Sequence, residues 1–282
     1  MRRIRTLDSN TKREYSGKPE KPTISNKAER KWHKKAERIV TWFENIQIIF
    51  PGSKFIALPV QMKVDRNLES FIAEKLNQLD TGIQSADVES APVDINEYAE
   101  KYDIPKEIMD DINANEAGIF RFNDQYLIFS PGKENKTVLV QLKLKHSLNH
   151  KDIKFDIDEE SDGTQRLLDL LPMIFATGHD TSIYFVDEID RSLHTKLSQY
   201  LLSDFAQRAK EGSNQMIFTA HEISLIDLHL FRQDEIWFID KNQTGESKIK
   251  PLSDFLLQEG MDTIKAYLSG RFGAVPMVRR DN

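Results

Sequence analysis

Two acidic residues follow directly on a short apolar run in the segment SIYFVDE, residues 182–188. A buried strand that ends in Asp-Glu can present one carboxylate, Asp187, to Mg²⁺ and the second, Glu188, to an attacking water molecule. Acids at this position can also cap a helix or form a surface turn after the strand. The pair by itself leaves both interpretations open.

A histidine stands at the end of the next apolar run, where QMIFTA is followed by His221. A lone histidine is more often a structural residue than a catalytic one. If the two runs are neighbouring strands of a parallel sheet, however, their ends lie about 5 Å apart. The imidazole N–H of His221 could then reach a phosphate group close to Glu188.

A third polar group opens the segment EESDGTQRLLDLLPMIF, residues 159–175. The hydroxyl of Ser161, the bare backbone of Gly163 and the amide of Gln165 would suit phosphate oxygens at a helix N-terminus. The alternative is an ordinary capped core helix, because RLLDLLPMIF forms an apolar stripe without any ligand.

The elements that must position these residues alternate between helix and strand. From Ser161 onward the patterns predict helix, strand, helix and strand, followed by a further strand at EIWFID. Because the strands are continuous apolar runs, we expect half of an α/β doubly wound fold, with a parallel sheet flanked by helices. Chemistry in such sheets takes place at the carboxyl ends of the strands.

The residues before this α/β pattern predict further regions. Residues 1–26 contain turn formers and prolines and are expected to form a flexible basic lead. Residues 27–117 are expected to be mostly helical, beginning with an amphipathic helix that docks on the body, although IIFPGSKFIALPV is strand-like. Residues 118–282 would form the main lobe, which opens with a β-meander over residues 118–158.

Composition narrows the class of protein. The 282 residues are 39% hydrophobic and include no cysteine, so the chain can bury a core, while disulfides, thiolate metal sites and cysteine nucleophiles are excluded. We expect a cytoplasmic protein without a membrane partner, because no apolar run approaches the length of a membrane span.

Charge is unevenly distributed along the chain. Met1 to Val40 contain 13 Lys and Arg against 5 Asp and Glu, a charge of +8, which leaves −14 for the remainder of a chain whose net charge is −6. The basic lead could contact nucleic acid. It could equally be a solvated segment without a ligand.

Taken together, the three polar segments resemble the C-terminal half of an ABC-type ATPase head. The resemblance is to the AAA-type core domain ATPases related to the RecF, SMC and OLD proteins. It covers residues 41–278, most specifically residues 160–240, and implies half of a P-loop NTPase fold. The segments that carry it are ESDGTQRLLDLLP, VDEIDRSLH, FTAHEISLIDLHLFRQDEIWFID and YLSGRFGAVP.

The resemblance implies ATP and Mg²⁺ as cofactors and a role for each matching residue. Ser161, Gly163 and Gln165 would form the signature motif, which binds the γ-phosphate of ATP held by an opposing subunit. Two departures are mild: Thr164 stands where a second glycine is frequent, with a closer backbone approach to phosphate, and Glu160 stands where leucine is common.

The remaining matches fall on the two strand ends. Asp187 would be the Walker B residue that holds Mg²⁺, Glu188 the catalytic glutamate and His221 the switch histidine. The D-loop, which lies at the dimer seam in this family, would contain Asp190, Ser192 and His194.

One departure from the family is serious. No G-x-x-x-x-G-K-S/T motif occurs in the sequence, and the candidates PGSKF and SPGKENKT lack the second glycine. We therefore expect the P-loop to be supplied by another chain. The expected partner is a second copy, in a homodimer, or a P-loop-bearing partner ATPase. The family implies roles in DNA repair or anti-phage defence.

Two alternatives remain at this point. A non-catalytic interaction or nucleic-acid-binding module would explain the missing P-loop, but it would not need Asp187, Glu188 and His221 together. A Mg²⁺ nuclease that uses Asp187, Glu188 and Asp190 is weaker, because no Asp-x-Asp pair ends a strand and no basic residue joins the acids.

Overall fold

The computed structural model describes residues 27–55, 57–102, 104, 106, 109–110, 118–122, 125–130, 136–148, 151–242, 244–257 and 261–275. The expected flexible lead at residues 1–26 lies outside these ranges.

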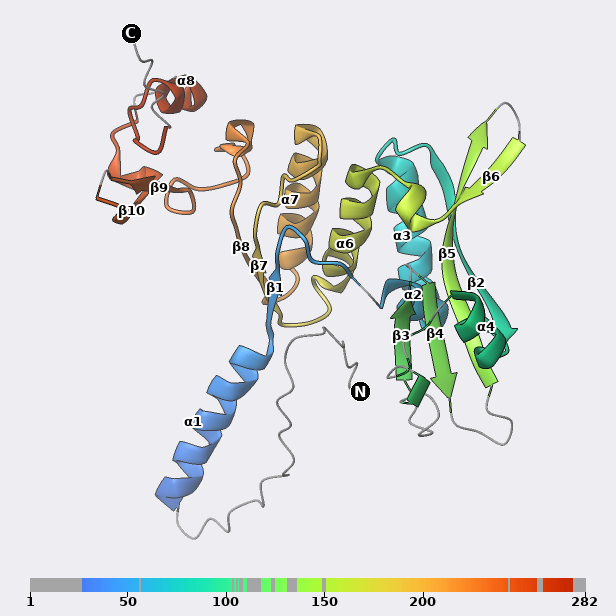
Figure 1. The fold of residues 1–282 in the computed structure, drawn as a ribbon. Helices are drawn as coiled ribbons and strands as arrows, with labels where there is room; N and C mark the ends of the chain where they lie inside the picture. Colours follow the sequence, from blue (N-terminus) through green and yellow to red (C-terminus); the bar gives the residue numbers. More distant parts are fainter. Residues whose placement is uncertain are drawn as a thin grey trace. The chain divides into compact units, whose positions relative to one another are not determined.

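The chain forms two compact units (Figure 1). The first comprises Met1–Gln47 and Gly52–Ala176, and the second comprises Ile48–Pro51 and Thr177–Asn282. The division at residues 27–117 and 118–282 that the sequence suggested stays a prediction.

The first unit contains a five-stranded antiparallel sheet in the order β2-β5-β4-β3, with β6 also paired to β5. Consecutive pairing of β3 through β6 confirms the predicted β-meander. The strand β2 was not expected, because its sequence IQSADVESAPV lacks a regular apolar alternation; it pairs along nearly its whole length with the long strand β5. The strand bounds are β2 Ile83–Val93, β3 Gly118–Phe122, β4 Gln125–Ser130, β5 Lys136–Leu148 and β6 Lys151–Phe155.

The described helices of the first unit are α1 Lys27–Glu44, α2 Leu58–Val64, α3 Arg66–Gln78, α4 Ile95–Tyr102 and α6 Asp162–Ala176, with the short 3-10 turn η1 Ile157–Glu159. The helices α2, α3, α4 and α6 contribute buried side chains to the core. The helix α3 begins at Asp65, whose carboxylate accepts from the Asn67 and Leu68 backbone N–H groups. It contacts β2 and α6, and its buried residues follow helical spacing: Leu68, Ile72 and Leu76.

The second unit contains a three-stranded sheet in the order β1-β7-β8. β7 and β8 are parallel, with Ile183 opposite Gln215 and Val186 opposite Phe218, and α7 follows β7. This mixed α/β arrangement of a parallel sheet with flanking helices confirms the expected fold class. The bounds are β1 Ile46–Ile49, β7 Ile183–Val186, α7 Thr195–Ala209, β8 Gln215–Phe218 and η2 Ile223–Leu225.

The end of the second unit differs from the prediction. EIWFID was expected to continue the parallel sheet, but it forms β9, which pairs antiparallel with β10 in a separate two-stranded sheet. Its Phe238 stacks on Tyr267 and Phe272 in a small aromatic core of its own. The remaining elements are β9 Trp237–Lys241, β10 Ser247–Pro251, η3 Leu252–Asp254 and α8 Thr263–Leu268.

Two expectations for the N-terminal half were also wrong. The second part of the strand-like segment IIFPGSKFIALPV belongs to helix α2, because Pro59 lies in its first turn, where a missing N–H costs nothing. The apolar stripe of α1 is exposed rather than docked, with Trp32 72% and Phe43 63% exposed. No helix in the described ranges is long and apolar enough to span a membrane.

We predict that Leu171→Ala in α6 will destabilise the protein by about 2–5 kcal/mol, because it leaves a cavity at a side chain that is fully buried. Urea unfolding followed by circular dichroism measures this loss. The matched control is Leu268→Ala, at a leucine that is 57% exposed, for which we expect a change within about 0.5 kcal/mol. Equal effects of the two substitutions would contradict the assigned core.

Candidate functional site

The end of β7 is held from both neighbouring strands. The hydroxyl of Thr219, directly after β8, donates to Asp187 Oδ1 at 2.6 Å and accepts from the Glu188 backbone N–H at 2.9 Å. On the other side, the Asp187 N–H donates to the Ile49 carbonyl oxygen of β1 at 2.8 Å. These bonds fix the backbone of both acids and one carboxylate oxygen of Asp187.

His221 lies beside Glu188. The distance between His221 Nε2 and Glu188 Oε1 is 3.5 Å, and the two side chains are 85% and 37% exposed. This confirms that the ends of β7 and β8 bring the two residues together. An exposed pair of this kind contributes little to the stability of the fold. Stability therefore does not explain why these two side chains lie together.

Asp190 ties the segment after β7 to the segment after β8. Its Oδ2 accepts from the backbone N–H groups of His221 at 3.0 Å and Glu222 at 2.8 Å. Its Oδ1 is buried and has no hydrogen-bond partner within the described part of the chain. The position of His221 therefore depends on Asp190, while a place for Asp190 at a dimer seam stays a prediction.

The other two predicted D-loop residues have local roles. Ser192 is exposed and has a φ of +60°, and Glu188 has a φ of +47°. Left-handed backbone is unfavourable for residues with a side chain, and such strain concentrates at functional sites. His194 caps α7, where its Nδ1 accepts from the Lys196 backbone N–H at 3.2 Å.

Glu222 anchors the loop that carries His221. It accepts hydrogen bonds from the Ser224 backbone N–H at 3.0 Å, the Ser224 hydroxyl at 2.7 Å and the Thr195 hydroxyl at 3.1 Å. These bonds, the Ser224 N–H first, hold the pKa of Glu222 below its ordinary value. Sequence patterns do not reveal this role, because Thr195 is 27 residues from Glu222 in the chain.

The predicted signature residues open helix α6 in the first unit. Ser161 caps the helix: its hydroxyl accepts from the Thr164 N–H at 3.2 Å and lies 3.0 Å from the Thr164 hydroxyl. Ser161 is exposed, whereas the Thr164 side chain is buried at 6% exposure. Thr164 therefore faces the interior of the first unit. Its side chain does not obstruct the exposed side of the helix N-terminus, where a ligand would approach.

Lys54 is a site residue that the sequence analysis missed. It was noted only as part of a failed P-loop, PGSKF, yet its Nζ lies 3.1 Å from Gln165 Oε1 and 3.5 Å from Asp169 Oδ2. Burial raises the pKa of Asp169, although the Phe55 N–H and Lys54 oppose the rise. The contact adds a cation at the helix end where the signature residues lie.

The predicted site thus falls into two groups. Asp187, Glu188, Asp190 and His221 come together in the second unit, and the signature residues come together at the start of α6 in the first.

The donor chemistry fits part of a MgATP site. Mg²⁺ in nucleotide hydrolases takes one or two carboxylates and otherwise water and phosphate oxygens, and Asp187 can serve as such a carboxylate. No cluster of three or more metal-binding His, Cys, Asp or Glu side chains occurs in the part of the chain that the structure describes. The phosphate cradle is the missing part, because the 282 residues contain no P-loop motif.

Comparison with known proteins identifies the family. The family model described as AAA domain, putative AbiEii toxin, Type IV TA system matches residues 8–227. The chain therefore belongs to this family of AAA domains, and the expected AAA-type or ABC-type ATPase class is confirmed at that level. The closer relation to RecF, SMC and OLD proteins stays a prediction.

No curated protein matches the chain. Among solved structures, it is similar to one described as "Structural biochemistry of ATP-driven dimerization and DNA stimulated activation of SMC ATPases", with 16% sequence identity and a TM-score of 0.28. The similarity covers 56% of this chain and 89% of that chain.

We predict that Asp190→Ala will loosen the His221 loop, because two backbone N–H groups lose their common acceptor, a loss of about 1–3 kcal/mol. Hydrogen exchange at the amides of residues 221 and 222 measures the loosening. Asp190→Asn keeps a carbonyl oxygen in place and should preserve most of the protection. Equal loss of protection in both variants would show that the acceptor atom is not what holds the loop.

Proposed function

We propose that this chain is the signature and Walker B component of an ATP-hydrolysing ABC-type ATPase. The observation that carries the proposal is the pairing of Glu188 with His221 at 3.5 Å, next to Asp187, at the carboxyl ends of two parallel strands. The membership of the AAA domain family supports the same assignment.

Each residue has a defined task in the proposed reaction. Asp187 would hold Mg²⁺, Glu188 would accept a proton from the attacking water, and His221 would donate a hydrogen bond to the γ-phosphate. MgATP, when bound, supplies the phosphoryl group and the metal charge that stabilises the transition state. Thr219 and Asp190 hold these side chains and the backbone around them in place.

The signature segment acts on nucleotide held by another chain. The Ser161 hydroxyl and the Gly163 backbone offer hydrogen-bond donors at the N-terminus of α6, where the helix dipole favours negative charge. The Gln165 amide already donates one hydrogen bond to the Glu160 carbonyl oxygen, so its second N–H is the donor that it would offer to nucleotide. If the Thr164 hydroxyl donates to Ser161, as their 3.0 Å separation allows, the Ser161 hydroxyl proton points to the ligand. Lys54 adds a positive charge nearby.

We assign the P-loop to a second, P-loop-bearing ATPase chain, because a second copy of these 282 residues would also lack the motif. The free edge of β8 supports a partner of this kind. Gln215 and Thr219 direct their N–H groups at β7, so by alternation the backbone groups of Met216 and Phe218 point to the other edge. No described strand pairs with that edge, and Ile217 is 56% exposed.

The exposed stripe of α1 provides a second surface for that partner. Trp32, Ile39 and Phe43 are 72%, 58% and 63% exposed on a helix with more basic than acidic residues. A partner that adds a strand to the edge of β8 and places an apolar, acidic face against α1 would bury both surfaces. We assign both surfaces to the P-loop-bearing chain.

The biological process belongs to the same proposal. Anti-phage defence in the cytoplasm is favoured over DNA repair, because the family description names a toxin of a type IV toxin–antitoxin system. A non-catalytic module is the second candidate, favoured by the missing P-loop motif. The nuclease interpretation has no support among the described residues, because Asp190 is committed to two backbone N–H groups.

We predict that Glu188→Gln will lower ATP turnover at least a hundredfold in the complex of this chain with its P-loop-bearing partner, while ATP-dependent association is preserved. The substitution removes the group that deprotonates water and keeps the shape of the side chain. Phosphate release under saturating MgATP measures turnover. The control is Glu235→Gln, which lies outside the site in an exposed ion pair with Arg232. Undiminished turnover in Glu188→Gln would refute the catalytic assignment and favour the non-catalytic module.

We also predict that Ser161→Arg will abolish ATP-dependent association, because the larger side chain occupies the outer face of the α6 N-terminus. Light scattering with and without MgATP measures the association. Asp158→Arg, at an exposed residue whose side chain takes no part in the Asp156–Glu159 capping box, controls for added positive charge. Association that survives Ser161→Arg would mean that this segment is only a capped helix.

A further inference from the structure

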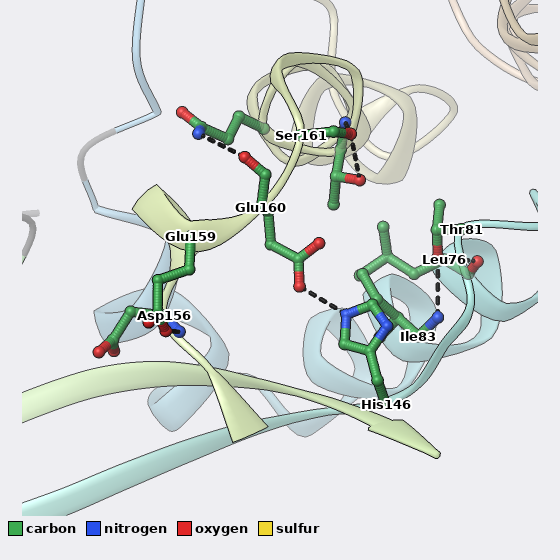
Figure 2. Close-up of polar contacts among 10 residues, drawn as sticks. Leu76, Thr81, Ile83, His146, Asp156, Glu159, Glu160 and Ser161 are labelled. Carbon is green, nitrogen blue, oxygen red and sulfur yellow. Dashed lines mark hydrogen bonds and ion pairs between the residues drawn. The ribbon is translucent and has the colours of Figure 1, made fainter. Parts of the chain in front are cut away.

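A partly buried His-Glu pair joins β5 to Glu160, the residue directly before the signature segment (Figure 2). His146 Nε2 in β5 lies 2.6 Å from Glu160 Oε1, and the two side chains are 18% and 7% exposed. A carboxylate can only accept, so the ring donates its Nε2 proton to Glu160.

The histidine ring is itself closely surrounded. It makes an edge-on contact with Phe155 of β6, with ring centroids 5.1 Å apart. Gly82, whose φ is +78°, lies against the ring, and a Cβ at that position would come within 3.5 Å of His146 Nδ1. The sheet therefore presents His146 to Glu160 in one orientation.

Glu160 connects the His146 contact to the signature residues. It precedes Ser161, and its backbone carbonyl accepts from Gln165 Nε2 at 3.0 Å. Upstream, Asp156 and Glu159 form a capping box that fixes η1, and the Glu160 N–H donates to the Ile157 carbonyl oxygen at 3.2 Å. Local bonds thus shape the segment, and the His146 contact joins it to the sheet, as Figure 2 shows.

We propose that His146 is a positioning residue. By holding Glu160, it fixes the conformation of the signature segment, residues 161–165. This inference rests on the proposed function for its consequence: the γ-phosphate donors at Ser161 and Gln165 are aimed only when Glu160 is held. A buried carboxylate without its partner is unfavourable, so loss of His146 expels Glu160 and turns the start of α6.

The first test uses the chain alone and needs no nucleotide. Hydrogen exchange at the amides of residues 163–166 reports opening of the first turn of α6. We expect His146→Leu to raise these rates about tenfold or more, His146→Gln to restore protection because its amide can donate to Glu160, and His146→Leu with Glu160→Leu to recover most of it. His229→Leu, at an exposed histidine in the second unit, is the control. Unchanged rates in His146→Leu would overturn the proposal.

The second test measures the consequence in the complex with the P-loop-bearing chain. We expect His146→Leu to lower kcat for ATP about tenfold with the affinity of the P-loop for nucleotide unchanged, and His146→Gln to recover activity. His146→Leu could increase hydrogen exchange and leave kcat unchanged, in a complex that Glu188→Gln inactivates. That result would overturn the positioning role of His146 and leave the proposed function intact. If Glu188→Gln leaves turnover intact, the proposed function fails, and the exchange rates still decide whether His146 holds the segment.

Discussion

The parallel pairing of β7 with β8 is the constraint on which the candidate site depends. Its register places Val186 opposite Phe218, so the residues that follow the two strands meet at one edge of the sheet. Hydrogen bonds from Thr219 and Asp190 then convert this proximity into fixed positions for Asp187, Glu188 and the His221 backbone. A slip of one residue would turn every side chain of β8 to the other face of the sheet and separate these groups.

The same sheet also explains why the chain looks incomplete as an enzyme. Its central strand ends in Asp187 and Glu188, and β8 ends the sheet with an edge that pairs with no described strand. Exposed strand edges are places where another chain can add a strand. In the function that we propose, a partner that brings the P-loop would also cover this edge.

The parts of the structure that depend on local pattern could be predicted from the sequence. The two strands are short apolar runs, and the spacing of parallel strands sufficed to expect His221 near Glu188. Contacts between distant segments could not be predicted: Lys54 reaches Gln165 across 111 residues, and His146 meets Glu160 only because β5 and β6 fold back as a hairpin. The strand at Trp237–Lys241 was assigned to the wrong sheet because an apolar run does not reveal its neighbour.

We propose that this chain holds the metal, water and signature residues of an ATPase site but not its phosphate cradle. Calorimetric titration of MgATP into the purified chain distinguishes such a partial site from a complete one. We expect no detectable binding by the chain alone and binding once the P-loop-bearing chain is added. Micromolar binding by the chain alone that is lost on Asp187→Ala would overturn the proposal, because these residues would then contain a complete nucleotide site.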